Sequence, residues 1–233
     1  MIPDRDAIRE RVASVRERIA AACVRSGRDP ASVTLVGITK TVPVEVIRMA
    51  VSAGVSELGE NRVQEALPKI AAIGPGPVWH MVGRLQTNKA ADVSSSFSLI
   101  HSLDRVELGL ALHRAAERVR RAVRCLVQVN VTGAGTQGGV LPEALPALVE
   151  SCLKLPYLRI GGVMAIGPHD STPESLRRAF GVARAARDQV VGLCGPEAGI
   201  LSAGMSGDYE VAVEEGSTLV RLGRTIFGER SAA

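Results

Sequence analysis

Lys40 is the residue of this chain that could most readily do covalent chemistry. It follows the apolar, β-branched run at residues 33–38, which predicts a buried strand. Pro43 fits the first turn of a helix over residues 44–53. Parallel α/β folds place their chemistry at the carboxyl ends of such strands. We therefore expect a desolvated ε-amine that can form a Schiff base with an aldehyde, the alternative being an ordinary surface lysine.

Two glycine-containing loops late in the chain suggest an anion site. Residues 202–208 carry Ser206 after a predicted strand at 199–202, and residues 221–225 follow a predicted strand at 218–223. In α/β barrels the loops after the last two strands commonly bind phosphate. Glycines let backbone N–H groups approach an anion, and Ser206 could add a hydroxyl donor. The alternative is a pair of ordinary loops with a capping serine.

A Schiff-base lysine and a phosphate site together suggest one ligand, pyridoxal 5′-phosphate (PLP), across the mouth of a barrel. Arg221 would lie between these two anchors and face the pyridine nitrogen. Other polar residues end predicted strands on the same side. The full set of strand-end residues is Lys40, Asn61, His80, His101, Asn130, Ser202 and Arg221. Each alone could simply cap a helix, but their common position favours a site at the active face of a barrel.

The alternation of strands and helices determines the expected fold. Apolar runs predict strands at residues 33–38, 55–61, 78–82, 98–102, 123–130, 158–164, 199–202 and 218–223. Helical patterns lie between them, at residues 44–53, 62–72, 86–91, 104–121, 142–153, 173–191 and 207–215. This predicts a single α/β domain over residues 1–233, a (β/α)8 TIM-type barrel with an extra amphipathic N-terminal helix. An open doubly wound sheet is the alternative, but the usual G-x-G-x-x-G turn does not follow the first predicted strand.

Composition narrows the classes of partner. The chain has 233 residues, of which 46% are hydrophobic and 22% charged, enough for one large core. Aromatic residues make up 3% and the net charge is +4, which argues against nucleic-acid binding. The four cysteines are far apart, which fits reduced thiols better than a zinc site or disulfides. Because the sequence shows neither a signal-peptide core nor a long apolar stretch, we expect a cytoplasmic protein that does not enter the membrane. We also expect a monomer.

Five stretches of the chain resemble the pyridoxal phosphate homeostasis proteins, single-domain relatives of the alanine racemase barrel. They are residues 39–41, 59–65, 79–89, 201–206 and 220–228. The resemblance implies a PLP fold-type III barrel with the cofactor on Lys40, phosphate contacts from Ser206 and from the backbone of Gly223 and Arg224, and Arg221 against the ring nitrogen. The expected cofactor-binding residues are Lys40, Asn61, His80, Ser202, Met205, Ser206, Arg221, Gly223 and Arg224. Members of the family buffer the cofactor or supply it, with PLP-dependent apoenzymes as possible recipients, and have no established catalysis.

Three residues depart from that family pattern. Gln137 stands where many members carry a lysine thought to handle a second cofactor, which puts cofactor transfer through this loop in doubt. Gly207 replaces a frequent acidic residue, and Arg224 replaces a frequent small one. Because the implied phosphate contact at position 224 uses the backbone, we expect these two changes to alter affinity more than chemistry.

Two enzymatic alternatives compete with a cofactor carrier. A PLP-dependent amino-acid racemase needs an acid/base group on each face of the substrate α-carbon, and the racemase family supplies the second from a tyrosine. Tyr157 precedes a predicted strand at the wrong end, and Tyr209 lies in a helix after the anion loop, so neither fits. A barrel enzyme that binds a phosphorylated substrate without the cofactor would be colourless, whereas a PLP protein is yellow.

Overall fold

Parallel strands form a closed barrel in the computed structural model of this chain, which describes residues 3–135, 137–169 and 171–228. The strands are β1 (Thr34–Ile38), β2 (Glu57–Glu60), β3 (Val78–Met81), β4 (Leu99–Leu103), β5 (Val123–Val129), β6 (Leu158–Ala165), β7 (Ile200–Ser202) and β8 (Leu219–Leu222). They follow one another round the barrel in sequence order. The barrel closes where β1 pairs with β8, with Thr34 opposite Leu219 and Gly37 opposite Leu222. This pairing confirms the barrel and excludes the open sheet.

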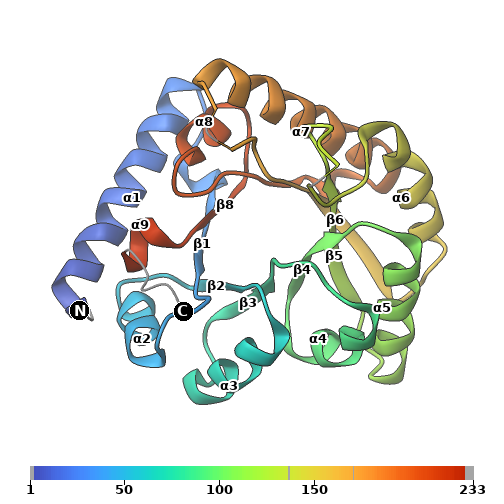
Figure 1. Cartoon of the computed structure of the whole chain (residues 1–233), viewed down its shortest axis with the longest axis horizontal. Helices are drawn as coiled ribbons and strands as arrows, with labels where there is room; N and C mark the ends of the chain where they lie inside the picture. The colour runs from blue at the N-terminus through green and yellow to red at the C-terminus, as the bar shows by residue number, and fades with distance from the viewer. Residues whose placement is uncertain (1–2, 136, 170, 229–233) are drawn as a thin grey trace.

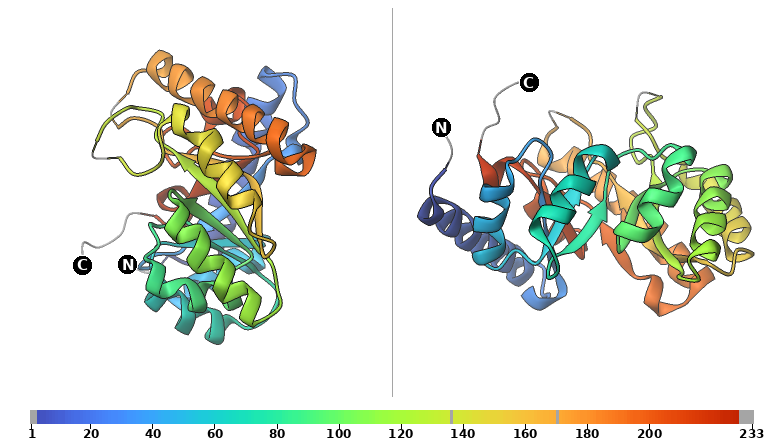
Figure 2. Two further views of the ribbon diagram at one scale, coloured as in Figure 1. Left: turned by 90° about the vertical axis from the view of Figure 1, so that its right-hand side faces the viewer. Right: turned by 90° about the horizontal axis from the view of Figure 1, so that it is seen from below.

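Helices cover the outside of the strand ring (Figure 1). They are α1 (Arg5–Arg25), α2 (Val44–Ser52), α3 (Val63–Ile73), α4 (Ala90–Ser96), α5 (Val106–Arg118), α6 (Leu145–Leu153), α7 (Pro173–Cys194), α8 (Tyr209–Glu214) and α9 (Arg224–Phe227). The 3₁₀ turns are η1 (Pro30–Ser32), η2 (Thr87–Lys89), η3 (Pro142–Ala144) and η4 (Pro196–Ala198). Figures 1 and 2 show α7 on one side of the strands and the pair α3 and α4 on the other.

Local capping explains where helix ends differ from expectation. The hydroxyl of Thr172 accepts the Ser175 N–H at 3.2 Å and begins α7, and Gly195, with φ of 98°, ends it later than predicted. The helix predicted at residues 86–91 is instead the turn η2 followed by α4. The helix α4 continues to Ser96, and its residues Ala90 and Val93 are buried. These differences leave the barrel order unchanged.

The barrel interior contains an apolar layer and a polar layer. The apolar layer consists of Val36, Ile38, Leu99, Leu126, Met164 and Leu219. Residues two positions further along a strand face the same side, so His101 follows Leu99 and Arg221 follows Leu219 into the interior. A larger apolar core lies between the strands and the surrounding helices. The polar layer, which includes His101 and Arg221, therefore lies at the carboxyl ends of the strands, inside a barrel whose wall is packed against the surrounding helices.

The extra N-terminal helix α1 covers the part of the barrel where α8 and α9 are short. Its apolar stripe, which includes Ile8, Val12 and Ile19, is buried, and it packs against α2, α8 and α9. Arg25 of α1 also pairs with Glu214 of α8 at 2.7 Å. The amphipathic helix expected from the sequence is thus confirmed. Among the described residues, no helix is both long and apolar enough to span a bilayer.

Candidate functional site

Lys40 lies in the turn after β1 rather than in the strand itself. The strand ends at Ile38, Thr39 is fully buried, and Lys40 is exposed. Thr41 adopts a positive φ of 60° and turns the chain towards α2. The expectation of a desolvated amine is therefore wrong for this structure, because the chain leaves the barrel wall one residue before Lys40. The position at the carboxyl end of β1 is as expected.

A buried ion cluster holds the residues on both sides of Lys40. The Lys69 Nζ donates to the Thr39 carbonyl at 2.6 Å and to Glu60 Oε1 and Glu65 Oε1 at 2.7 Å each. The Thr39 hydroxyl donates to the same Glu60 oxygen at 2.7 Å, and the Thr41 N–H donates to Glu65. Burial opposes the ionisation of Glu65, but the hydrogen bonds from Lys69 and Thr41 outweigh it and lower the pKa of Glu65. The cluster thereby fixes the turn that carries Lys40.

The sequence interpretation missed this role of Lys69. It placed the residue within a helix at 62–72 and gave it no contact with Lys40. The available signal was the i, i+4 spacing of Glu65 and Lys69, which puts both on one face of α3. That spacing ordinarily marks a solvated surface pair, whereas the Lys69 side chain here is only 10% exposed.

A chain of buried polar side chains crosses the barrel interior. His80 Nδ1 lies 2.9 Å from His101 Nε2, and His101 Nδ1 lies 3.0 Å from Ser202 Oγ. Arg221 Nη1 donates to Ser202 Oγ at 2.6 Å, and Nη2 donates to the Ala165 carbonyl at 3.0 Å. The structure thus brings together three of the expected cofactor-binding residues, His80, Ser202 and Arg221, with His101, which was expected at the same face but not as a cofactor-binding residue.

The donors in this chain have a single consistent order. Because a guanidinium only donates, Ser202 accepts from Arg221. Among the described residues His101 Nδ1 is the one acceptor for the Ser202 O–H, so we assign the hydroxyl as its donor. His101 then carries its proton on Nε2 and donates to His80 Nδ1, so His80 carries its proton on Nε2. That atom lies 2.6 Å from Glu57 Oε2 but makes no hydrogen bond within the described residues. Burial, His80 and Arg221 hold the pKa of His101 well below 6.5, so His101 is neutral, as this order requires.

Arg221 is the buried cation at the centre of this end of the barrel. Burial lowers the pKa of Arg221 to about 10, with Asp208 acting in the opposite direction, so the guanidinium stays charged at neutral pH. Two of its five N–H donors point to Ser202 and Ala165, as described above, and the other three donate to none of the described residues. Burial raises the pKa of Asp208, whose Oδ1 accepts the Met205 N–H at 2.5 Å and shapes the loop before α8.

The two predicted anion loops lie side by side. Ser206 Oγ accepts the Thr225 N–H at 3.4 Å, which joins the loop after β7 to the start of α9. Gly204, with φ of 96°, lets the loop after β7 pack closely against the start of α8, because a Cβ there would come within 2.9 Å of Tyr209 Cα. Gly223 and the exposed Arg224 open α9 at the same edge, and Met205 is 38% exposed there. Since β8 neighbours β1, these loops and Lys40 share one end of the barrel.

Asn61 and Asn130 have different surroundings. Asn61 is half-buried directly after β2 and lines a pocket at the barrel mouth. The Asn130 side chain is used within its own loop: its Nδ2 donates to the carbonyls of Ala134 and Gln137, and its Oδ1 accepts from Thr132 and Gly133. Asn130 therefore organises the loop after β5.

Comparison with known proteins relates this geometry to a family. A family profile described as the N-terminal domain of alanine racemase matches residues 4–231. The pyridoxal phosphate homeostasis protein of Aquifex aeolicus is 44% identical over 222 residues, covering 95% of this chain and 97% of that protein. The PipY structure of Synechococcus elongatus with PLP bound is 34% identical, covers 95% of this chain and 100% of its own, and has a TM-score of 0.82.

The resemblance to alanine racemase itself is one of fold. The structure from Corynebacterium glutamicum has a TM-score of 0.76 but 14% identity, and the match covers 97% of this chain and 62% of that one. This shared barrel confirms the expected architecture and carries no functional assignment. The identity to relatives of equal length decides the family instead. The chain belongs to the pyridoxal phosphate homeostasis protein family.

Proposed function

We propose that this protein binds PLP covalently through Lys40 and takes part in PLP homeostasis, by buffering the cofactor or delivering it to PLP-dependent apoenzymes. The observation that carries the proposal is the shared position of Lys40, Arg221 and the Ser206 loop at one end of a single barrel. The family assignment supports it, as does the PipY structure described as having PLP bound. We also propose that residues 1–233 form a single PLP-binding domain, since the family profile matches residues 4–231.

The residues present fit the chemistry of the cofactor. Ser206 and the backbone at Gly223 and Arg224 would hold the phosphate, and the remaining donors of Arg221 would meet the ring nitrogen. When bound, PLP supplies an aldehyde that captures amines and a ring that withdraws electrons. Because Arg221 can only donate, it keeps a proton off the ring nitrogen and thereby limits that withdrawal. His80 and Ser202 would act by orienting Arg221, and Asn61 and Met205 would border the cofactor.

The lysines of the chain narrow the choice of attachment point. There are four, at positions 40, 69, 89 and 154. Lys69 is buried with its three donors engaged, and Lys154 follows α6 at the opposite end of the barrel. Lys89, at the end of η2, is the remaining competitor. The attachment point for PLP is therefore either Lys40, which we propose, or Lys89.

We further propose that the protein is not a racemase, because neither tyrosine is positioned as a second acid/base group. Tyr157 precedes β6 and packs beside His113, with ring centroids 5.9 Å apart. Tyr209 is buried outside the strand ring beneath α1, with the Arg18 guanidinium 5.4 Å from its ring centroid. Its hydroxyl finds no hydrogen-bond partner in the described part of the chain. Both positions support a carrier over a two-base enzyme.

The loop after β5, where Gln137 departs from the family pattern, supports a carrier that does not bind a second cofactor in this loop. The Gln137 amide donates to the Ile166 carbonyl at 3.0 Å, and its oxygen accepts from the Thr132 hydroxyl at 2.6 Å. Both ends of this side chain are therefore engaged. We also propose that the protein is cytoplasmic, which the four unpaired cysteines favour. We propose that it is a monomer, which light scattering would test.

The experiment that tests the proposal is identification of the lysine that carries PLP. Protein incubated with PLP should be yellow, and borohydride reduction followed by peptide mapping should place the label on Lys40. Lys40→Ala should remove the colour, whereas the matched control Lys89→Ala should retain it. Label on Lys89, or a protein that stays colourless with PLP, would contradict the proposal.

A further inference from the structure

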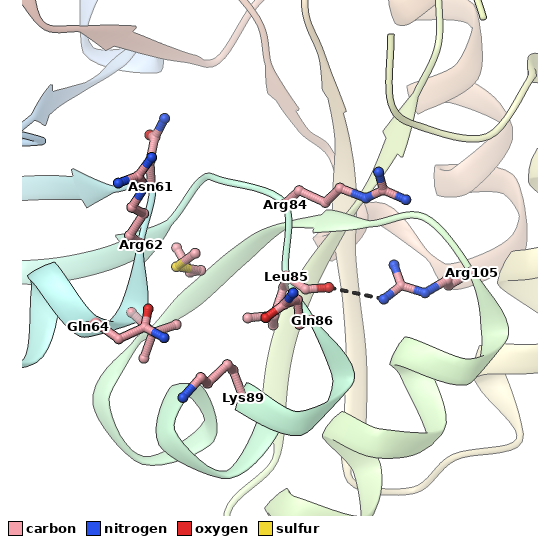
Figure 3. Close-up of a pocket in the computed structure, with 10 residues that line it drawn as sticks. Asn61, Arg62, Gln64, Arg84, Leu85, Gln86, Lys89 and Arg105 are labelled. Atoms are coloured by element: carbon pink, nitrogen blue, oxygen red, sulfur yellow. Dashed lines mark hydrogen bonds between the residues drawn. The ribbon is translucent and has the colours of Figure 1, made fainter. Parts of the chain in front are cut away.

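The pocket that Asn61 lines lies at the mouth of the barrel, between the loops that follow β2 and β3 (Figure 3). Its volume is about 530 Å³, within the range of roughly 300–1,000 Å³ that is usual for small-molecule sites. Met81 and Leu85, each 1% exposed, contribute an apolar floor. Arg62, Lys89 and Arg105 bring cationic groups to its walls. Arg84 adds a fourth cation that extends into solvent, with its side chain 80% exposed.

Positive charge in this pocket exceeds the negative charge near it. None of the described residues that line the pocket is acidic. Asp104 pairs with Arg105 and lies 4.0 Å from Arg84, and Asp92 lies 4.0 Å from Lys89. The Arg62 guanidinium has neither a hydrogen bond nor an ion pair to any other described residue, and its charge acts on Glu65 only at a distance. An anion would therefore meet cations that this part of the chain leaves incompletely neutralised.

Contacts between neighbouring loops hold the walls of the pocket in place. Gly83 packs so closely on the loop after β2 that a Cβ there would lie 2.2 Å from the Asn61 carbonyl oxygen. The Ser102 hydroxyl donates to the Gly83 carbonyl at 2.7 Å, and Arg105 Nη2 donates to the Leu85 carbonyl at 3.0 Å, the bond drawn as a dashed line in Figure 3. A ligand would thus bind a site whose walls are already ordered, which reduces the entropy cost of binding.

We propose that this pocket binds a second small ligand, a phosphate monoester, beside the Lys40 site. Arginine guanidinium groups match a phosphate dianion through paired N–H donors, and Lys89 adds a point charge. The side-chain amides of Gln64 and Gln86 provide donors and acceptors for a polar body, above the apolar floor. This site is separate from the anion loops after β7 and β8, because its lining comes from the segments after β2, β3 and β4. It shares Asn61 with the proposed cofactor site, otherwise uses residues of its own, and goes beyond the proposed function.

The test is a titration of protein that peptide mapping shows to carry borohydride-reduced PLP on Lys40 and not on Lys89, with glycerol 3-phosphate as the probe and calorimetry as the readout. We expect saturable binding at one site, weakened roughly tenfold or more by Arg62→Gln, which loses a charge-assisted hydrogen bond. Arg84→Gln should weaken it by a smaller factor, because the Arg84 side chain is largely solvated. Arg114→Gln in α5 is the matched control, because it removes the same charge from an exposed position and should leave binding unchanged. Circular dichroism would confirm that each variant is folded.

Three results would overturn the proposal. The blocked protein could fail to bind glycerol 3-phosphate, Arg62→Gln and Arg84→Gln could bind it as well as Arg114→Gln does, or succinate could bind more tightly than the phosphate ester. If Lys40 takes up no PLP, the proposed function fails at that earlier step, and the same titration is performed on untreated protein. The two proposals can therefore fail separately.

Discussion

Replacing Lys69 by methionine should destabilise the protein strongly, although Lys69 lies in a helix on the outside of the barrel. The substitution removes hydrogen bonds of 2.6, 2.7 and 2.7 Å and leaves Glu60, which is fully buried, without its cation. Breaking a buried ion pair by removing one partner costs about 3–5 kcal/mol. In a chain of this size each kcal/mol lowers the melting temperature by about 2–4 °C, so we expect a fall of roughly 6–20 °C.

Urea unfolding at neutral pH measures this free energy, and Lys154→Met is the matched control because Lys154 is exposed at the end of α6. A double variant, Lys69→Met with Glu60→Gln, should recover part of the loss, since the buried charge is removed with its partner. A loss below about 1 kcal/mol for Lys69→Met, the size typical of a surface pair, would refute the reasoning.

The effect should also depend on pH in a defined direction. The pKa of Glu65 is lowered in the folded protein from its ordinary value of 4.5, so its contribution is fully present above that pH and is lost as the pH falls through the folded value. The difference in unfolding free energy between the wild type and Lys69→Met should therefore narrow below about pH 4.5. A difference that stays constant into that acid range would show that the pairing with Glu65 contributes nothing.

Three further predictions concern the site itself. Ser206→Ala should weaken PLP binding by about 1–3 kcal/mol, the cost of an unmade charge-assisted hydrogen bond, as measured by equilibrium dialysis; unchanged affinity would remove Ser206 from the phosphate site. His101 should keep the neutral Nε2–H pattern in ¹⁵N NMR from about pH 7.5 to about pH 6, because its pKa lies well below 6.5; protonation near pH 6.5 would contradict the donor order described above. Saturating L-alanine should yield no D-alanine, and turnover on the order of 10 per second would overturn the non-racemase proposal.

Local patterns in the sequence were sufficient to predict the barrel. Strand period, helix period and glycine positions depend on neighbouring residues, so the order of strands and helices and the positions of the loops around Ser206 and Gly223 could be inferred directly. The strand-end position of Lys40 followed from the same reasoning. Family resemblance added the expected partners of the cofactor, which periodicity alone does not identify.

Only the tertiary structure decided how these residues meet. Lys69 reaches Thr39 across 30 residues of sequence, and His101 reaches Ser202 across 101. Such contacts depend on barrel closure and on which way each side chain points, and neither leaves a local pattern. The exposure of Lys40 was mispredicted because it also depends on a contact distant in sequence. The strand pattern predicts burial up to Ile38. Beyond it, the positive φ of Thr41 and the hydrogen bond from the Thr41 N–H to Glu65 set the turn and leave the Lys40 side chain exposed. The sequence thus determined which chemical groups stand at the mouth, and the closure of the barrel decided which of them touch.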